Sequence, residues 1–314
     1  MHISIPGRPG VGKSQLLRKI RRQVLDREAE ASGYRIEGYA LQAPWGDWRP
    51  ILRVATPPEV TIASMATAML RALADEDPEY GDKGEKTRRI LAKLMEQRVR
   101  IILIDEFQHL TDHRTDKFAY AAADWLKGLL NEEDATPEWK RDGSGFFVHA
   151  VFFGTQTMNA MFVGNGQLAR RGRGVHPFRP YDWVDPAERA LFGQTLDKID
   201  RMLPFPEASF TGDAIRFDLH RATDAVISRI AAITQLAGFK ALDLGQPNIT
   251  PNLFEQAFDE LLWEIGSDDF YARPNPWREK NHEPGIMNAP APDPSRKTRI
   301  KGKKRNDTPD FSKR

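Results

Sequence analysis

The chain has no cysteine among its 314 residues, so disulfide bonds, thiolate catalysis and cysteine-based zinc sites are excluded. Its seven histidines are scattered, and none forms the H-E-x-x-H spacing of a zinc hydrolase. No run approaches the ~20 apolar residues of a membrane span, and the N-terminus lacks the basic-then-apolar order of a signal peptide. With 40% hydrophobic residues, the sequence predicts a globular cytoplasmic chain of one large or two smaller domains, without membrane contact.

Net charge is also small, at +2, but it is unevenly distributed. Residues 296–314 carry nine Lys or Arg and two Asp, which leaves 37 basic and 42 acidic residues in the rest of the chain. This tail is poor in large apolar residues, and a proline-rich stretch precedes it. Composition therefore predicts a disordered basic segment over residues 283–314. Its partner is nucleic acid or an acidic protein surface, unless it serves only to keep the chain in solution.

A phosphate-binding loop is present near the N-terminus, where residues 7–14 match G-x-x-x-x-G-K-[ST] in full. An alternating apolar run over 2–5 and a helical pattern over 16–25 supply the strand–loop–helix context that this motif needs. Backbone N–H groups of such a loop point at phosphate oxygens, Lys13 reaches the β- and γ-phosphates, and the Ser14 hydroxyl ligates Mg²⁺. The predicted ATP-binding residues are Gly7, Pro9, Gly10, Val11, Gly12, Lys13, Ser14 and Gln15.

A second motif lies about ninety residues later. Four consecutive apolar residues, 101–104, predict a strand buried on both faces, as in a parallel sheet. The strand ends in Asp105 and Glu106. In a nucleoside triphosphatase the first carboxylate holds Mg²⁺, and the second polarises the attacking water as a general base. We therefore assign Asp105, with Ser14, to the metal and Glu106 to catalysis.

Strand and helix patterns alternate through the first part of the chain. Further strands are predicted at 50–54 and 146–153, and residues 34–41 are either a strand or an insertion hairpin. Helices are predicted at 62–73, 87–97 and 118–130, and a charged linker at 75–85. Beyond residue 186 only helices are predicted, at 187–202, 223–242 and 251–265. The expected architecture is a three-layer parallel α/β domain, residues 1–184, followed by a helical lid, residues 185–282.

Two further polar groups follow the strand predicted at 146–153. A hydroxyl at Thr155 would lie beside the carboxylate strand and hold the attacking water, unless Thr155 is an ordinary helix cap. The segment 167–173 then holds three arginines within four residues, Arg170, Arg171 and Arg173. One of them is either a group that reaches the γ-phosphate of a neighbouring subunit and stabilises transition-state charge, or part of a solvated basic loop.

The order of these motifs resembles the AAA+ ATPases of DNA transposition, of the TniB/TnsC type, over about residues 3–265. The strings DEFQHL at 105–110 and QLARR at 167–171, with the helical pattern from Ala225, carry the resemblance. It implies a P-loop NTPase (AAA+) fold with a helical lid. It also implies a bacterial regulator that binds ATP and Mg²⁺ and assembles with copies of itself on double-stranded DNA. Such a regulator recruits a transposase and a target-selector protein, and it disassembles when ATP is hydrolysed.

The resemblance also implies roles for single residues. Thr155 is similar to the first sensor, and Arg171, or less closely Arg170, is similar to the trans-acting arginine finger. Arg229 falls near the place of a second sensor. Arg114 and Lys117 follow the carboxylate strand, where proteins of this type often place DNA-binding loops.

Two other functions remain open. One is a helicase loader or replication-initiator-like ATPase of the same fold, against which the absence of a helix-turn-helix pattern after residue 266 counts. The other is an ATP-switched scaffold on DNA with little hydrolysis, against which the intact pair of Asp105 and Glu106 argues.

Overall fold

The computed structural model describes residues 2–110, 121–122, 124–126, 128–129, 148–158, 172–265 and 275–278. These residues fall into two compact units. The first holds the chain up to Asp182 together with Ala225–Ala232, and the second holds Trp183–Asp224 and the part from Ile233 onward. The domain limits expected from the sequence stay a prediction.

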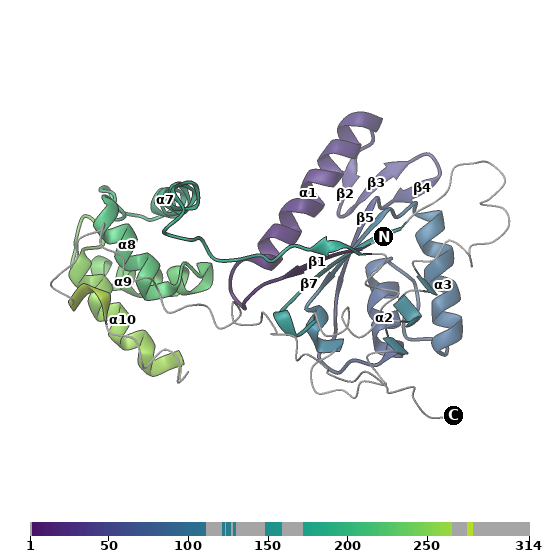
Figure 1. Cartoon of the computed structure of the whole chain (residues 1–314). Helices are drawn as coiled ribbons and strands as arrows, with labels where there is room; N and C mark the ends of the chain where they lie inside the picture. The colour runs from purple at the N-terminus through teal and green to yellow at the C-terminus, as the bar shows by residue number, and fades with distance from the viewer. Residues whose placement is uncertain are drawn as a thin grey trace, which may run out of the picture. The chain divides into compact units, whose positions relative to one another are not determined.

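A five-stranded parallel sheet forms the centre of the first unit (Figure 1). Its strands are β1 (His2–Pro6), β5 (Ile51–Ala55), β6 (Ile101–Asp105), β7 (His149–Gly154) and β8 (Gly172–Val175). They lie in the order β5-β6-β7-β1-β8, so β1, the first strand in sequence, lies between β7 and β8. Parallel sheets bind ligands at the carboxyl ends of the strands where the strand order reverses in this way. Both sequence motifs follow strands at that end, one after β1 and one at the end of β6.

Helices cover both faces of this sheet and give the three layers that the sequence predicts. Helix α1 (Lys13–Ser32) buries Leu17 in a cluster with Leu103 of β6. Helices α2 (Ile62–Ala72) and α3 (Lys83–Glu96) pack on the opposite face, in a cluster that includes Ile102 and Ile104 (Figure 1). Successive side chains of a strand point to opposite faces, which is why a continuous apolar run was required here.

Local capping explains where the helices begin and end. The φ angles of Gly12 (104°) and Gly33 (74°), on either side of α1, lie in the left-handed region that glycine adopts at little cost. The Thr61 and Ser64 side chains form a reciprocal capping box at the start of α2. The Asp82 carboxylate accepts the Glu85 N–H at 2.8 Å, so α3 begins at Lys83, inside the stretch that we expected to be a charged linker.

Residues 34–41, for which the sequence allowed either a strand or an insertion hairpin, belong to a hairpin insertion. Strands β2 (Ile36–Glu37), β3 (Ala40–Ala43) and β4 (Gly46–Trp48) form a separate antiparallel sheet. Strand β8 was not predicted, because the GRGV sequence of residues 172–175 contains a single large apolar residue. Within the helix predicted at 118–130, the described residues are helical, and the Trp125 indole N–H donates to the Thr87 hydroxyl at 3.0 Å.

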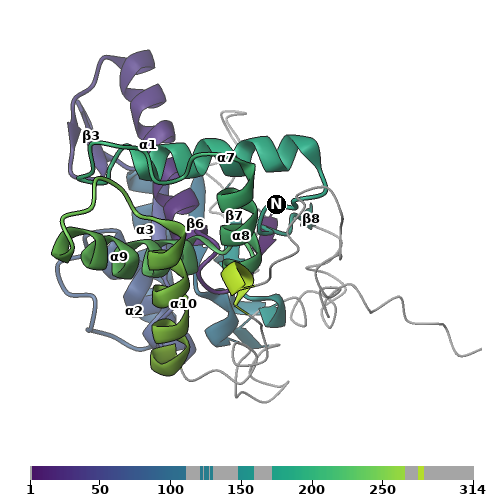
Figure 2. The same cartoon turned by 90° about the vertical axis from the view of Figure 1, so that its left-hand side faces the viewer.

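The second unit is helical (Figure 2). Its helices are α7 (Pro186–Asp200), α8 (Asp213–Thr223), α9 (Ile227–Asp243) and α10 (Pro251–Ile265), although α9 up to Ala232 belongs to the first unit. Phe192, Phe210 and Phe254 are fully buried. The Trp277 ring stacks on Phe254 with centroids 5.9 Å apart.

The prediction of one continuous helix over residues 223–242 was wrong, and α8 was missed. The chain breaks between α8 and α9 at Asp224 and Ala225, whose φ angles are 53° and 54°. Both values lie in the left-handed region, which ends a right-handed helix. Among the described residues, no single helix is long and apolar enough to cross a membrane; only α8 and α9 counted together, across this bend, reach that length.

Candidate nucleotide-binding site

The loop between β1 and α1 surrounds a buried lysine. The Lys13 side chain is 7% exposed, and its ammonium donates to the carbonyls of Gly7 at 2.8 Å and Arg8 at 2.9 Å. Burial lowers the pKa of Lys13, whereas the Glu106 and Asp105 carboxylates raise it by a smaller amount. The positive φ angles of Gly10 (78°) and Gly12 (104°) produce the sharp curl of this loop. A desolvated cation inside a curled loop at a helix N-terminus fits a polyphosphate.

The first carboxylate of β6 is buried and holds an arginine. Asp105 is 2% exposed, and its Oδ2 accepts from Nη2 of Arg53 on β5 at 3.0 Å. The strands β5 and β6 pair in parallel, with Arg53 opposite Leu103. The carboxylate chemistry and its position beside Lys13 fit a Mg²⁺ ligand, and the guanidinium neutralises the buried charge in this structure.

The second carboxylate is held by Gln108, a residue of the DEFQHL string to which the sequence analysis gave no role of its own. Glu106 has a φ of 54°, an unusual conformation for a residue other than glycine and one that often marks functional sites. Its Oε2 accepts from the side-chain N–H of Gln108 at 2.5 Å. The other end of the same amide, Oε1, accepts from the backbone N–H of Thr155 at 3.1 Å. One buried side chain therefore joins the predicted general base to the end of β7.

Gly154 makes room for this bridge. A Cβ atom at position 154 would lie 2.7 Å from Gln108 Oε1 and 3.2 Å from the Gln108 backbone nitrogen. The Thr155 hydroxyl itself bonds the Thr157 hydroxyl at 2.7 Å. The backbone N–H of Thr155 is therefore the group that contacts Gln108, which lies just after the carboxylate strand. The proposed sensor role of the Thr155 hydroxyl stays a prediction.

We expect Gln108→Ala to lower the rate of ATP hydrolysis at least tenfold while nucleotide affinity stays within about twofold. The substitution releases Glu106 from a fixed hydrogen bond, and misplacing a general base costs rate rather than ground-state binding. Steady-state assays measure the rate of ATP hydrolysis, and equilibrium binding of a fluorescent ATP analogue measures nucleotide affinity. Gln256→Ala, which removes an exposed glutamine of α10, is the matched control. A Gln108→Ala protein with the wild-type turnover rate would show that the bridge has no part in positioning Glu106.

A second segment of the first unit, Ala225–Ala232, contacts the phosphate loop. The backbone N–H of Ser228 donates to the Gly10 carbonyl at 3.0 Å. A Cβ atom at Gly10 would collide with the Ser228 side chain, so this glycine is required for space as well as for its φ angle. Arg229, the predicted second-sensor residue, follows Ser228 directly in sequence, and its role stays a prediction.

The chain beyond β8 also packs against the loop. The Phe178 backbone N–H donates to the Pro6 carbonyl at 2.7 Å, and its own carbonyl lies 2.6 Å from where a Cβ of Gly7 would stand. Any side chain at Gly7 would therefore displace this segment. Contacts of Phe178 and Ser228 with the loop were not predicted, since Phe178 belongs to no recognised motif and Ser228 was only one position of the helical pattern from Ala225.

The structure brings the predicted nucleotide residues of the two motifs together in one unit. Val11 is buried, Ser14 is partly buried in the first turn of α1, and Pro9 and Gln15 are exposed. Within the described part of the chain, no cluster of three His, Asp or Glu side chains forms a separate metal site. Four predicted residues lie outside the described residues, and their roles stay predictions: Arg114, Lys117, Arg170 and Arg171.

Two signals in the sequence pointed to the residues that we missed. Arg53 is the single charged residue in the apolar strand Ile51–Ala55, and a charge at such a position needs a partner. Gln108 stands two residues after Glu106 in a buried 3₁₀ turn, η1 (Phe107–Leu110). Neither signal identifies the distant partner, because Asp105 lies on the neighbouring strand β6 and Thr155 follows β7.

Comparison with known proteins agrees with this geometry. A family model described as an AAA domain matches residues 1–158, just over half of the chain. No curated protein sequence matches. Among solved structures the chain is similar to Cdc6p from Pyrobaculum aerophilum, with 17% identity and a TM-score of 0.59 over 87% of this chain and 64% of that one. It is also similar to the ORC2 protein of Aeropyrum pernix in its ADPNP–ADP complexes, with 14% identity and a TM-score of 0.57 over 83% and 61%.

A third similar structure is the ORC1 protein of Aeropyrum pernix in complex with DNA, with 16% identity and a TM-score of 0.56 over 83% of this chain and 59% of that one. The chain thus spans about three fifths of the length of these proteins. At such low identity the likeness shows the fold, and the predicted AAA+ fold, a parallel sheet followed by helices, is confirmed. The finer TniB/TnsC assignment stays a prediction. With its phosphate loop, its carboxylate strand and a family match over residues 1–158, the chain belongs to the AAA domain family.

Proposed function

We propose that the protein is a Mg²⁺-dependent ATPase that acts as a nucleotide-controlled switch on duplex DNA. The observation that carries the proposed ATPase activity is the buried Lys13 ammonium in the curled loop, next to the carboxylates of Asp105 and Glu106. This combination of a phosphate cradle, a metal ligand and a general base is what phosphoryl transfer to water requires.

Each residue has a separate part in the proposed reaction. Lys13 neutralises phosphate charge, and Ser14 with Asp105 would hold Mg²⁺, which when bound supplies further neutralisation of the phosphate oxygens. Glu106 accepts a proton from the attacking water. Gln108 fixes the Glu106 carboxylate, and thereby couples it to the end of β7.

Two biological settings fit this chemistry, and a different observation favours each. The likeness in fold to ORC and Cdc6 proteins covers more than four fifths of the chain and favours a replication initiator or helicase loader. The strings DEFQHL and QLARR favour a regulator that assembles on DNA and recruits a transposase and a target selector. The fold is the broader observation, so the initiator-like setting is the leading candidate and transposition regulation is the second.

Steady-state ATP hydrolysis with and without duplex DNA tests the common proposal. We expect Mg²⁺-dependent hydrolysis and a rate that changes at least severalfold when duplex DNA is added. Absence of hydrolysis under both conditions would contradict the proposal and favour an ATP-switched scaffold. A transposase gene beside the gene for this protein would favour the second setting over the first.

Removing residues 296–314 should weaken duplex DNA binding at low salt and flatten its salt dependence, while basal ATP hydrolysis stays unchanged. The nine basic residues of this segment would add an electrostatic contribution that comes from counterion release and does not depend on sequence. The remaining 37 basic and 42 acidic residues provide no such attraction at long range. Fluorescence anisotropy across a salt series measures both affinity and slope. If both are unchanged in the truncated protein, the segment does not contact DNA.

A further inference from the structure

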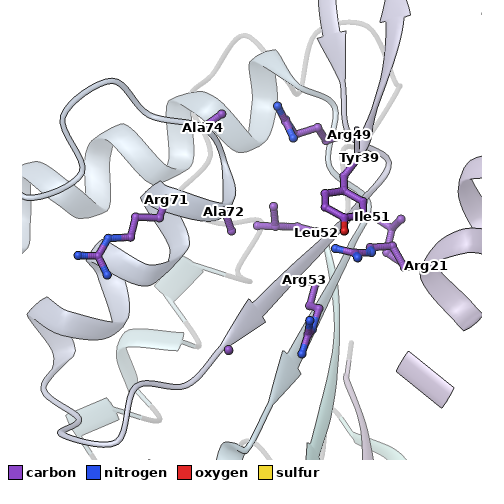
Figure 3. Close-up of a pocket in the computed structure, with 10 residues that line it drawn as sticks. Arg21, Tyr39, Arg49, Ile51, Leu52, Arg53, Arg71, Ala72 and Ala74 are labelled. Atoms are coloured by element: carbon purple, nitrogen blue, oxygen red, sulfur yellow. The ribbon is translucent and has the colours of Figure 1, made fainter. Parts of the chain in front are cut away.

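The edge of the sheet carries a cavity of about 340 Å³ that is distinct from the phosphate loop (Figure 3). It is bordered by the edge strand β5, helix α1, the hairpin insertion and the end of α2. Among the described residues, the ten that line it include four arginines and no carboxylate: Arg21, Arg49, Arg53 and Arg71. The volume of the cavity is in the range of small-molecule sites. All the charged side chains among these ten residues are positive.

The cations of this cavity are only partly compensated. Arg49, Arg53 and Arg71 pair with Asp47, Asp105 and Glu79, respectively, through one terminal nitrogen each. The Nε groups of Arg49 and Arg53 are buried, and within the described part of the chain they have no hydrogen-bond acceptor. Buried donors without an acceptor are costly, so the hydrogen-bonding capacity of these two guanidiniums is not used up by their carboxylate partners.

Arg21 is the guanidinium that faces the cavity from the helix. It stacks 3.5 Å from the centre of the Tyr39 ring, and Figure 3 shows the two side chains pointing toward each other. Burial, and in smaller part the nearby charge of Arg53, lowers the pKa of Arg21. Stacking fixes the orientation of this guanidinium before a ligand arrives, which reduces the entropy that binding costs.

We propose that this cavity binds a phosphate-bearing ligand. Phosphate oxygens accept two parallel hydrogen bonds from a planar guanidinium, which is why arginine clusters select them. The cavity is larger than one phosphate group, so the ligand is a compound with several phosphates or a stretch of nucleic acid backbone. Both sources present the same oxygens to Arg21, Arg49 and Arg53.

The cavity and the nucleotide site share one residue. Arg53 lines the cavity and donates to Asp105, the predicted Mg²⁺ ligand, at 3.0 Å. A phosphate that engages Arg53 competes with Asp105 for its guanidinium and so changes the charge balance at the catalytic site. This link rests on the proposed function, whereas binding in the cavity does not.

Pyrophosphate binding to the full-length Lys13→Ala protein, measured by calorimetry, tests the proposal, because this substitution disables the phosphate loop. We expect binding that Arg21→Ala in the same background weakens about tenfold or more, the effect of losing a charged hydrogen-bond donor. Arg22→Ala, on the same helix and paired with Asp26 on the surface, is the control and should leave affinity unchanged. Arg21→Lys keeps the positive charge but cannot donate two parallel hydrogen bonds. Its affinity for pyrophosphate should therefore lie between those of the Arg21→Ala and Arg22→Ala variants.

The absence of binding to the Lys13→Ala protein, or equal affinity in the Arg21→Ala and Arg22→Ala variants, would overturn the proposal. Competition identifies the source of the phosphate. If pyrophosphate displaces a short duplex and Arg21→Ala weakens duplex binding, the ligand is nucleic acid backbone. If pyrophosphate binds without affecting the duplex, the ligand is a free phosphate compound. Neither result depends on ATP hydrolysis, so failure of the proposed ATPase would be seen separately.

Discussion

Glu106→Gln should bind ATP with near wild-type affinity and hydrolyse it about 10²–10⁴-fold more slowly, which is the usual cost of removing a positioned general base. Glutamine has almost the same shape as glutamate, so the hydrogen bond to Gln108 and the left-handed backbone at position 106 are retained. Only the ability to accept a proton is lost. Lys13→Ala, in contrast, should abolish nucleotide binding, because the buried ammonium neutralises phosphate charge.

Equilibrium binding of a fluorescent ATP analogue and single-turnover hydrolysis separate these two effects. Glu96→Gln, an exposed carboxylate at the end of α3, is the matched control and should behave as wild type. Hydrolysis by Glu106→Gln at the wild-type rate would refute the assignment of the general base. Full binding by Lys13→Ala would place the nucleotide elsewhere.

Arg171→Ala should lower hydrolysis by about 10³–10⁵-fold, the contribution of an arginine supplied from a neighbouring subunit, while each monomer still binds ATP. The residue lies outside the described part of the chain, so this prediction rests on the arginine cluster at 170–173 and on the resemblance of QLARR. Its neighbour Arg170 is the alternative finger.

Mixing variants tests whether the arginine acts in trans. An Arg171→Ala subunit keeps its own nucleotide site, and a Lys13→Ala subunit keeps its arginine. A mixture should therefore regain activity at hybrid interfaces, measured as hydrolysis above the sum of the separate proteins. If Arg171→Ala and Arg170→Ala each retain full activity, no arginine of this pair serves as a finger.

The parts of the site that the sequence predicted are those built from consecutive residues. A phosphate loop depends on glycines and a lysine within eight positions, and the carboxylate strand depends on an apolar run that ends in Asp105. Alternation of strands and helices then indicated a parallel sheet, since such strands need helical crossovers. These features are visible without knowing which strands are neighbours.

What the sequence did not reveal depends on contacts between distant segments. Arg53 meets Asp105 only because β5 and β6 are adjacent, and Gln108 reaches Thr155 across 47 positions. The break between α8 and α9 was missed for another reason. Asp224 and Ala225 are not glycines, so their left-handed conformation leaves no mark in the pattern of apolar residues.

The shared amide of Gln108 has a spectroscopic consequence. The Thr155 amide proton and the Glu106 carboxylate are held by opposite ends of one rigid planar group. If that side chain rotates to release the carboxylate, the Thr155 proton loses its acceptor at the same moment. The chemical shift and exchange rate of a single backbone amide thus report whether Glu106, the proposed general base, is restrained or free, without any label at the proposed nucleotide site.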